Sequence, residues 1–267
     1  MANIFISYAD DRFKESLNRI ARQAKGVGIF DKIIKYTPKD LPLHIKASPL
    51  FAFRKGGGYW LWKPYIIYHS LELCKVGDII FYCDSGCTLD AKSPEWELWK
   101  ELLKHHDALF FQYRDGYDYG WGVFPDKAAY KYWAKPSTAN FFRRYADPAL
   151  MEFDVFWGGL IVIKKTDRGS MIIDQWYKTM LFHPELVADA FGADMKDENH
   201  TYHTHDQALL TPLIYIHRNA DNCAILPETS ESRIGQPAVL ATRWMQGRMS
   251  LMNKIKYTVL SFLHNDK

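Results

Sequence analysis

One stretch, residues 54–90, constrains the fold more than any other part of the chain. It begins with three consecutive glycines at 56–58, which run into a cluster of aromatic residues. Lys63 and Pro64 then open a predicted helix over residues 63–73, since proline suits the first turn of a helix, where its missing N–H needs no partner. The apolar run at 79–83 has the length and composition of a buried strand, and it ends in Asp84-Ser85-Gly86.

The order of these elements predicts a ligand site. In open α/β sheets, ligands bind beyond the carboxyl ends of the strands, and Asp84 stands in such a position. The upstream glycines allow the backbone to approach a phosphate or a sugar closely. A helix N-terminus that carries Lys63 favours an anion. Each feature alone also occurs in ordinary turns and loops, but their combination favours a site.

The first 36 residues predict a nucleotide-binding βαβ unit. An apolar strand over 3–8 is followed by a helix over 13–23 and a second strand over 28–36. Asp10 or Asp11 is placed to cap the helix, and Gly26 to Gly28 end it. The sequence contains neither a GxGxxG dinucleotide fingerprint nor a P-loop.

The composition indicates a single globular α/β domain with, at most, a small appendage: 267 residues are 48% hydrophobic and 24% charged. The 15% share of aromatic residues suits either stacking on sugar rings or a large core. A net charge of +3 does not argue for nucleic acid. Four cysteines without metal-finger spacing predict buried thiols in a reducing compartment. Since no signal-peptide pattern or membrane-length apolar run appears, we expect a cytoplasmic protein.

The middle of the chain predicts further elements around a long irregular segment. Helices are expected over 94–103, 137–145 and 169–182, with strands over 107–113 and 153–164. Residues 114–135 show neither the hydrophobic period of a helix nor that of a strand. We interpret this segment as a variable loop on the acceptor side. Trp157-Gly158-Gly159 interrupts the second of these strands, either as a β-bulge or where a ligand or another backbone approaches.

His200, His203 and His205 precede a predicted helix over 207–216. A zinc cluster is one interpretation, although the spacing matches neither HExxH nor a cysteine-bearing finger. The favoured interpretation takes Asp206 and Gln207 as polar groups at a helix N-terminus. There the helix dipole keeps Asp206 ionised, and Gln207 can hydrogen-bond sugar hydroxyls.

The tail, residues 241–267, predicts a basic amphipathic helix that is distinct from the domain over 1–240. An apolar stripe faces away from Arg243 and Lys254. Such a helix binds an anionic membrane surface or, alternatively, docks on the domain.

Residues 58–64 (GYWLWKP) and 82–87 (YCDSGC) resemble motifs of bacterial glycosyltransferases of surface-polysaccharide (O-antigen or capsule) synthesis, which have a GT-A-type fold. The resemblance continues through residues 156–159 (FWGG) and 205–207 (HDQ), so it covers most of the chain. It implies transfer of a hexose from a UDP-sugar, with galactose slightly favoured, to a saccharide acceptor such as a lipid-linked glycan. A lipid-linked acceptor would place the protein on the inner face of the cytoplasmic membrane.

The resemblance also assigns roles to residues. Asp84, Asp206 and Gln207 would be catalytic, and Asp84 with His205 would hold a divalent cation, Mn²⁺ or Mg²⁺, that neutralises the leaving diphosphate. The sequence departs from the family here, because Asp84-Ser85-Gly86 lacks the second carboxylate of the usual DxD motif; Asp90 or His205 would have to complete the metal shell. The donor-side candidates are Ser7, Tyr8, Asp10, Asp11, Gly58, Trp62, Lys63, Trp157, Gly158 and Gly159.

Two other classes stay open. Asp84 and Asp206 could form the carboxylate pair of a glycosidase, although the βαβ start argues against it. The aromatic residues would also suit a non-catalytic carbohydrate-binding protein. Whether transfer retains or inverts the anomeric configuration is left undecided.

Overall fold

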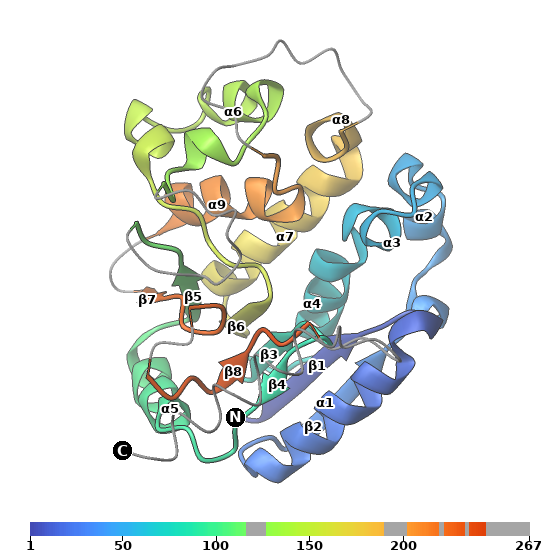
Figure 1. Ribbon diagram of the computed structural model, residues 1–267, viewed down its shortest axis with the longest axis vertical. Coiled ribbons are helices and arrows are strands. Elements are labelled where there is room, and N and C mark those ends of the chain that lie inside the picture. Colours follow the sequence, from blue (N-terminus) through green and yellow to red (C-terminus); the bar gives the residue numbers. More distant parts are fainter. Residues whose placement is uncertain (116–126, 190–201, 219–221, 233–234, 244–267) are drawn as a thin grey trace, which may run out of the picture.

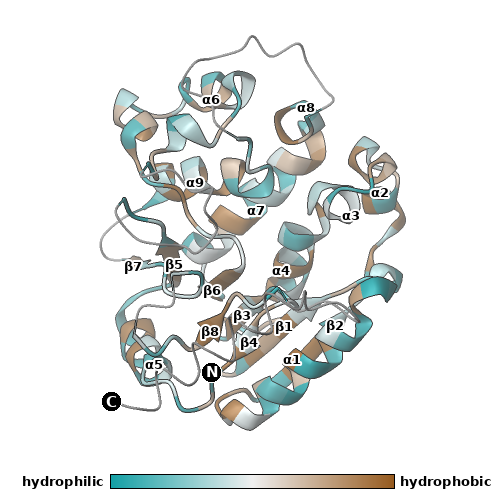
Figure 2. Ribbon diagram, in the orientation of Figure 1, coloured by the Kyte–Doolittle hydropathy of each residue, from teal (hydrophilic) through white to brown (hydrophobic). Residues whose placement is uncertain are grey.

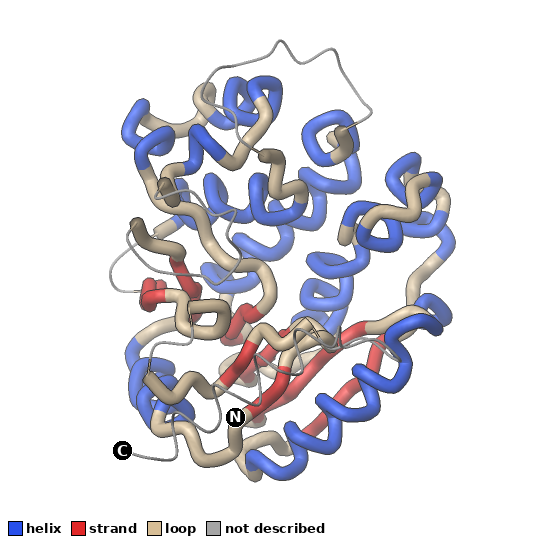
Figure 3. The backbone as a smooth tube through the Cα atoms, in the orientation of Figure 1, coloured by secondary structure: helices blue, strands red, loops and turns tan. Residues whose placement is uncertain are grey.

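The computed structural model describes residues 1–115, 127–189, 202–218, 222–232 and 235–243. Its centre is a six-stranded mixed sheet with the order β2-β1-β3-β6-β5-β7, surrounded by helices (Figures 1 and 3). The strands are β1 (Asn3–Tyr8), β2 (Lys32–Tyr36), β3 (Ile79–Cys83), β5 (Ala108–Gln112), β6 (Leu160–Lys164) and β7 (Cys223–Pro227). The main helices are α1 (Lys14–Val27), α4 (Trp62–Glu72), α5 (Glu95–His105), α6 (Pro136–Phe142), α7 (Asp167–Phe182) and α9 (Asp206–His217). The expected α/β fold class and its N-terminal βαβ unit are confirmed.

The strand order of the sheet reverses at β1. From β1 the chain passes to β2 on one side and then to β3 on the other, and β1 is parallel to both. β6 pairs antiparallel with β3 and with β5. The Ser7 hydroxyl donates to the carbonyl oxygen of Cys83 at 2.7 Å, which ties the carboxyl ends of β1 and β3 together. Such a switch point is where open α/β sheets leave a crevice for ligands.

The core explains much of the aromatic content. Trp99, Trp176, Tyr82, Tyr130 and Phe110 are among the largest fully buried side chains. The central strands are mainly apolar, whereas α1 shows a polar outer side (Figure 2). Tyr130 belongs to the segment 114–135 that we expected to be an irregular loop. Its described residues, 127–135, include a 3₁₀ turn (Tyr130–Tyr132) packed into the core, and residues 116–126 lie outside the described part of the chain.

The glycine run forms a left-handed turn, α3 (Gly56–Tyr59), and not an open loop. The φ angles of Gly56, Gly57 and Gly58 are 57°, 59° and 96°, and Tyr59 and Trp60 continue the turn at 51° and 61°. A left-handed turn costs a residue with a Cβ roughly 1–2 kcal/mol, which explains why three of the five residues are glycines.

One predicted strand was too long, and three strands were not predicted. The predicted strand over 153–164 contains only β6; residues 153–159 form a loop because Trp157-Gly158-Gly159 turns the backbone toward the neighbouring helix α9. β7 was not predicted, nor were the short strands β4 (Thr88–Leu89) and β8 (Val239–Leu240), which pair with each other. Strands of two residues are too short to give a periodic signal.

The chain after β8 lies against the motif that contains Asp84. Thr242 donates its hydroxyl to the carbonyl oxygen of Gly86 at 2.8 Å, and the N–H of Ala241 donates to Ser230. Residues 241–243 are therefore not helical, and the rest of the predicted tail helix lies outside the described residues. In the described part of the chain, no helix has the length and hydrophobicity needed to cross a membrane.

Candidate functional site

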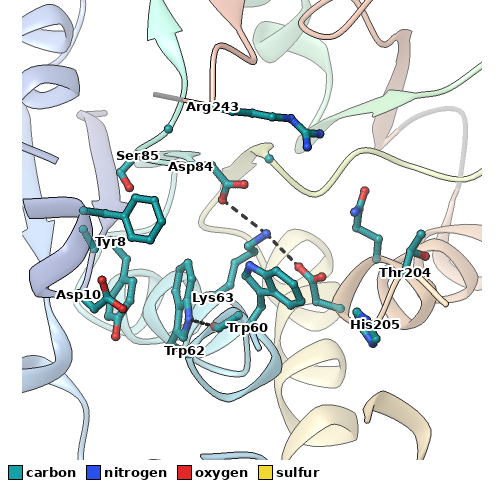
Figure 4. A pocket seen from close by; sticks show the side chains of 18 of the residues that line it. Tyr8, Asp10, Trp60, Trp62, Lys63, Asp84, Ser85, Thr204, His205 and Arg243 are labelled. Atoms are coloured by element: carbon teal, nitrogen blue, oxygen red, sulfur yellow. Dashed lines mark hydrogen bonds and ion pairs between the residues drawn. The ribbon is translucent and has the colours of Figure 1, made fainter. Parts of the chain in front are cut away.

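A pocket of about 1160 Å³ opens at the carboxyl ends of β1 and β3 (Figure 4). This volume is large enough for a nucleotide-sized ligand together with a second small molecule. The pocket brings together residues from both halves of the chain. The predicted site residues that line it are Tyr8, Asp10, Trp62, Lys63, Asp84, Trp157, Gly159, His205, Asp206 and Gln207.

Lys63, at the first turn of α4, is the centre of the site. Its ammonium group lies 2.9 Å from Asp206 Oδ2 and 3.5 Å from Asp84 Oδ1, and it donates to the carbonyl oxygen of Gly158 at 3.1 Å. The lysine is only 3% exposed. Asp84 Oδ1 also accepts a hydrogen bond from the Tyr82 hydroxyl. Residues separated by more than 100 positions thus share one buried cation.

The charges of this cluster depend on one another. Burial by itself would lower the pKa of Lys63, but the carboxylates of Asp206 and Asp84 outweigh it and raise that pKa above the ordinary value. Burial raises the pKa of Asp206, and the Lys63 ammonium opposes this rise. Asp84 has the more accessible side chain, 37% exposed against 5% for Asp206. Asp84 is therefore the carboxylate of the pair that a ligand reaches more easily.

The turn Trp157-Gly158-Gly159 connects the polar residues. Gly158 N–H donates to Gln207 Oε1 at 2.9 Å, and Asp84 N–H donates to the carbonyl oxygen of Gly159 at 2.8 Å. A Cβ on Gly158 would lie 2.8 Å from Gln207 Cγ, so only glycine allows this close approach. The expectation of a close approach at these glycines is confirmed. Gly158, however, packs against Gln207 of α9 and does not face open space in the pocket.

The predicted donor side lies at the end of β1. Tyr8 and Trp62 stack on each other with ring centroids 4.0 Å apart, and the Trp62 indole N–H donates to Gly56 at 2.9 Å. Asp10 caps the short 3₁₀ turn (Asp11–Phe13) before α1 and pairs with Arg12 at 2.6 Å. The two stacked rings and this ion pair form the wall of the pocket beside β1.

His205 is held under Trp60. The two rings are stacked with centroids 5.7 Å apart, and His205 Nδ1 lies 2.9 Å from the carbonyl oxygen of Val187. Burial lowers the pKa of His205 to about 4, so the ring is neutral at physiological pH. Trp60, His205 and Arg243 all have positive φ and all line the pocket. Backbone strain of this kind concentrates at functional sites.

The wall opposite β1 comes from residues that the sequence did not single out. Glu231 accepts hydrogen bonds from the Tyr113 hydroxyl at 2.8 Å and from Arg243 at 3.0 Å. Burial raises the pKa of Glu231 to about 7, with Arg243 opposing the rise. The neighbouring Glu228 accepts the N–H of Glu231 at 2.8 Å, and burial followed by the charge of Glu231 raises its pKa to about 8. No short motif marks these residues; the Glu-x-x-Glu spacing within a polar segment was the only available signal.

Four predicted donor residues do not line the pocket: Ser7, Asp11, Gly58 and Gly158. Asp11 is exposed in the 3₁₀ turn, and Gly58 packs against the Phe51 ring, which a Cβ would approach to 2.8 Å. His203 is buried beside His205, and His200 lies outside the described residues. The expected loop over 114–135 contributes Trp133 to the pocket.

The residues do not form the metal site that the resemblance implies. His205 Nδ1 is held by Val187, its Nε2 is buried, and Trp60 covers the ring, whereas Asp84 interacts with Lys63 and Tyr82 (Figure 4). Within the part of the chain that the structure describes, no three His, Cys, Asp or Glu side chains are grouped to hold a metal ion.

Comparison with known proteins gives similarity at the level of three-dimensional structure only. No family model matches the chain. No curated protein matches it in sequence. A glycosyltransferase involved in glycosylation of the major capsid of PBCV-1 overlaps with a TM-score of 0.45 at 7% identity, over 85% of this chain and 83% of that one. Mouse xyloside xylosyltransferase 1 overlaps with a TM-score of 0.40 at 12% identity, over 83% and 84%. The galactosyltransferase LgtC, solved with donor and acceptor sugar analogues, overlaps with a TM-score of 0.36 at 15% identity, over 82% and 72%. These overlaps are too loose to assign a function.

Proposed function

We propose that the protein is a glycosyltransferase that moves a hexose from a UDP-sugar to a saccharide acceptor. The observation that carries the proposal is the convergence of Lys63, Asp84 and Asp206 in one large pocket at the switch point of an α/β sheet. Nucleotides bind at such switch points, the leaving diphosphate needs positive charge close to it, and the positive charge that develops at the anomeric carbon is stabilised by a carboxylate.

In the proposed reaction, the bond between the anomeric carbon and the β-phosphate oxygen breaks, and the electron pair leaves with UDP. The acceptor hydroxyl oxygen forms the new bond to the anomeric carbon and loses its proton. Asp206 and Gln207 line the pocket at the start of α9, and we place the reacting sugar beside them. Asp206 would take up the proton in an inverting reaction or stabilise positive charge at the anomeric carbon in a retaining one.

The wall opposite β1 supports a saccharide as the second substrate. Tyr113, Trp133 and Trp157 line it, and aromatic faces stack on sugar rings. Glu231 and Thr204 offer polar groups between them. More specifically, we propose that the donor sugar is galactose and that the acceptor is a lipid-linked glycan in surface-polysaccharide synthesis.

Two rival functions fit the site less well. A glycosidase needs two carboxylates that face the scissile bond from opposite sides, whereas here one ammonium group lies between Asp84 and Asp206, within ion-pair distance of both. A carbohydrate-binding protein has no chemical need for a buried charge cluster, which is costly to desolvate.

Calorimetry with UDP tests the proposal, since neither rival has a reason to bind a nucleotide. We expect saturable UDP binding, and we expect Asp84→Asn to lower the transfer rate by about 10²–10³ while the far-ultraviolet circular dichroism is unchanged. Asp174→Asn is the matched control, because Asp174 is part of an exposed pair with Lys178 on α7. A folded Asp84→Asn protein with near-normal transfer would contradict the role of Asp84.

We also propose that the residues after Thr242 attach the enzyme to the cytoplasmic face of an anionic membrane, where a lipid-linked acceptor would be found. Truncation after Thr242 should abolish sedimentation with anionic vesicles and leave the domain soluble. Unfolding of the truncated chain would show instead that the tail docks on the domain.

A further inference from the structure

The buried ammonium group of Lys63 lies among three oxygen atoms. It donates a hydrogen bond to Gly158 O at 3.1 Å and forms ion pairs with Asp206 Oδ2 at 2.9 Å and Asp84 Oδ1 at 3.5 Å. The side chain is 4% exposed. A positive charge therefore already lies between the two carboxylates that face the pocket (Figure 4).

The same carboxylates would be the first choice for a divalent cation, but among the described residues no third His, Cys, Asp or Glu side chain is grouped with them. Gly86 stands where a second carboxylate would complete the motif of Asp84. His205 is separated from Asp84 by Trp60 and is oriented by Val187. A cation with six or more oxygen ligands would have to displace Lys63 from the space between Asp84 and Asp206.

We propose that Lys63 takes the place of the divalent cation, so that this chain binds the donor diphosphate without a metal ion. The inference rests on the proposed transferase function. Lys63 compensates the charges of Asp84 and Asp206, which would otherwise repel the diphosphate. Arg243 lines the pocket on the other side of Asp84, with a side chain 57% exposed, and its guanidinium group is suited to bind phosphate oxygens (Figure 4).

The test is calorimetric titration of the wild-type protein with UDP, once in EDTA and once in MnCl₂, together with equilibrium dialysis of Mn²⁺ in saturating UDP. We expect the two UDP dissociation constants to agree within about twofold and the protein to retain no Mn²⁺ above the UDP blank. UDP binding that needs Mn²⁺ or tightens by about tenfold or more with it would overturn the inference and leave the proposed function intact. Absence of UDP binding in both buffers would overturn the proposed function, and the inference with it.

A variant gives an independent measurement. Lys63→Met should weaken UDP binding in EDTA by about tenfold or more, because the two carboxylates lose their compensating charge. Lys100→Met, which removes an exposed lysine paired with Glu97, should leave UDP binding unchanged. Unchanged UDP affinity in folded Lys63→Met protein would overturn the inference. The wild-type comparison decides the question even if Lys63→Met does not fold.

Discussion

Two clusters of carboxylates lie at the pocket, and the protein stabilises them in different ways: Asp84, Asp206 and Glu231 line the pocket, and Glu228 lies next to Glu231. Asp84 and Asp206 share the buried ammonium group of Lys63. Glu228 and Glu231 have no buried cation between them: Glu231 pairs with Arg243, whose side chain is 57% exposed, and Glu228 accepts backbone N–H groups. We call these the lysine cluster and the glutamate cluster.

The difference shows what a buried cation does. In the lysine cluster burial raises the pKa of Asp206, and the Lys63 ammonium group opposes this rise. In the glutamate cluster burial raises the pKa values of Glu231 and Glu228 to about 7 and about 8, with only the half-exposed Arg243 opposing it at Glu231. The glutamate cluster is therefore expected to change its protonation near neutral pH.

The largest effect should come from removing the cation of the lysine cluster. Lys63→Met removes the cation that pairs with the buried Asp206 and the partly exposed Asp84, and should lower the free energy of unfolding by about 3–5 kcal/mol, measured by urea denaturation. Arg243→Met, the matched change in the glutamate cluster, should cost about 1 kcal/mol or less, because that guanidinium group is half exposed to water. Equal losses in the two variants would remove the distinction between the clusters.

A second effect separates binding from catalysis within the lysine cluster. Asp206→Asn keeps the shape of the side chain but removes a charge that acts on the reacting sugar, and should lower kcat by about 10²–10³ while UDP affinity stays within a few-fold. Asp174→Asn on the surface of α7 is the control. Weakened UDP binding with preserved kcat would place Asp206 on the donor nucleotide.

The glutamate cluster should make stability depend on pH. Both folded pKa values lie above the ordinary value of 4.5, so between about pH 5 and 8 the folded state binds more protons than the unfolded state. The stabilising contribution is complete below the unfolded pKa and is lost as the pH rises through the folded values. Stability should therefore fall over this window by several kcal/mol, at about 1.4 kcal/mol per pH unit for each group that is still protonated in the folded state, measured by urea denaturation at several pH values.

Glu228→Gln can still accept the backbone hydrogen bonds but cannot ionise, so it should flatten this fall in stability. Glu97→Gln, at a side chain 76% exposed, should leave the fall unchanged. If Glu228→Gln and the wild type lose stability equally with pH, the buried carboxylates do not titrate in this range.

The sequence predicted the lysine cluster better than the glutamate cluster for a physical reason. Lys63 lies at the start of a helix that the sequence marks by Pro64. Asp84 directly follows the apolar run over 79–83, which predicts a strand. Asp206 and Gln207 were identified in the same way, from their place at the start of a helix. When the hydrophobic pattern of a helix or strand is clear, the sequence also predicts where that element ends, and so which polar side chains lie at its ends.

The prediction of a metal site at Asp84 and His205 illustrates the limit of this approach. Both residues line the pocket, but the orientation of the His205 ring depends on Val187 and Trp60, which are distant in sequence. Likewise, Trp157-Gly158-Gly159 was recognised as a place of close approach, whereas its partner, Gln207, became known only from the fold.

The sequence by itself thus determined the α/β class, the N-terminal βαβ unit and the elements that carry Lys63, Asp84 and Asp206, because periodicity and capping are local properties of the chain. Only the tertiary structure decided that one lysine joins both carboxylates, and that Glu231 and Arg243 line the pocket with Glu228 beside Glu231. Those contacts depend on the pairing of β4 with β8 and on the packing of α9 beside the Gly158 turn. Lys63 and Asp206, for example, are 143 positions apart, and the sequence contains no local signal for a contact over that separation.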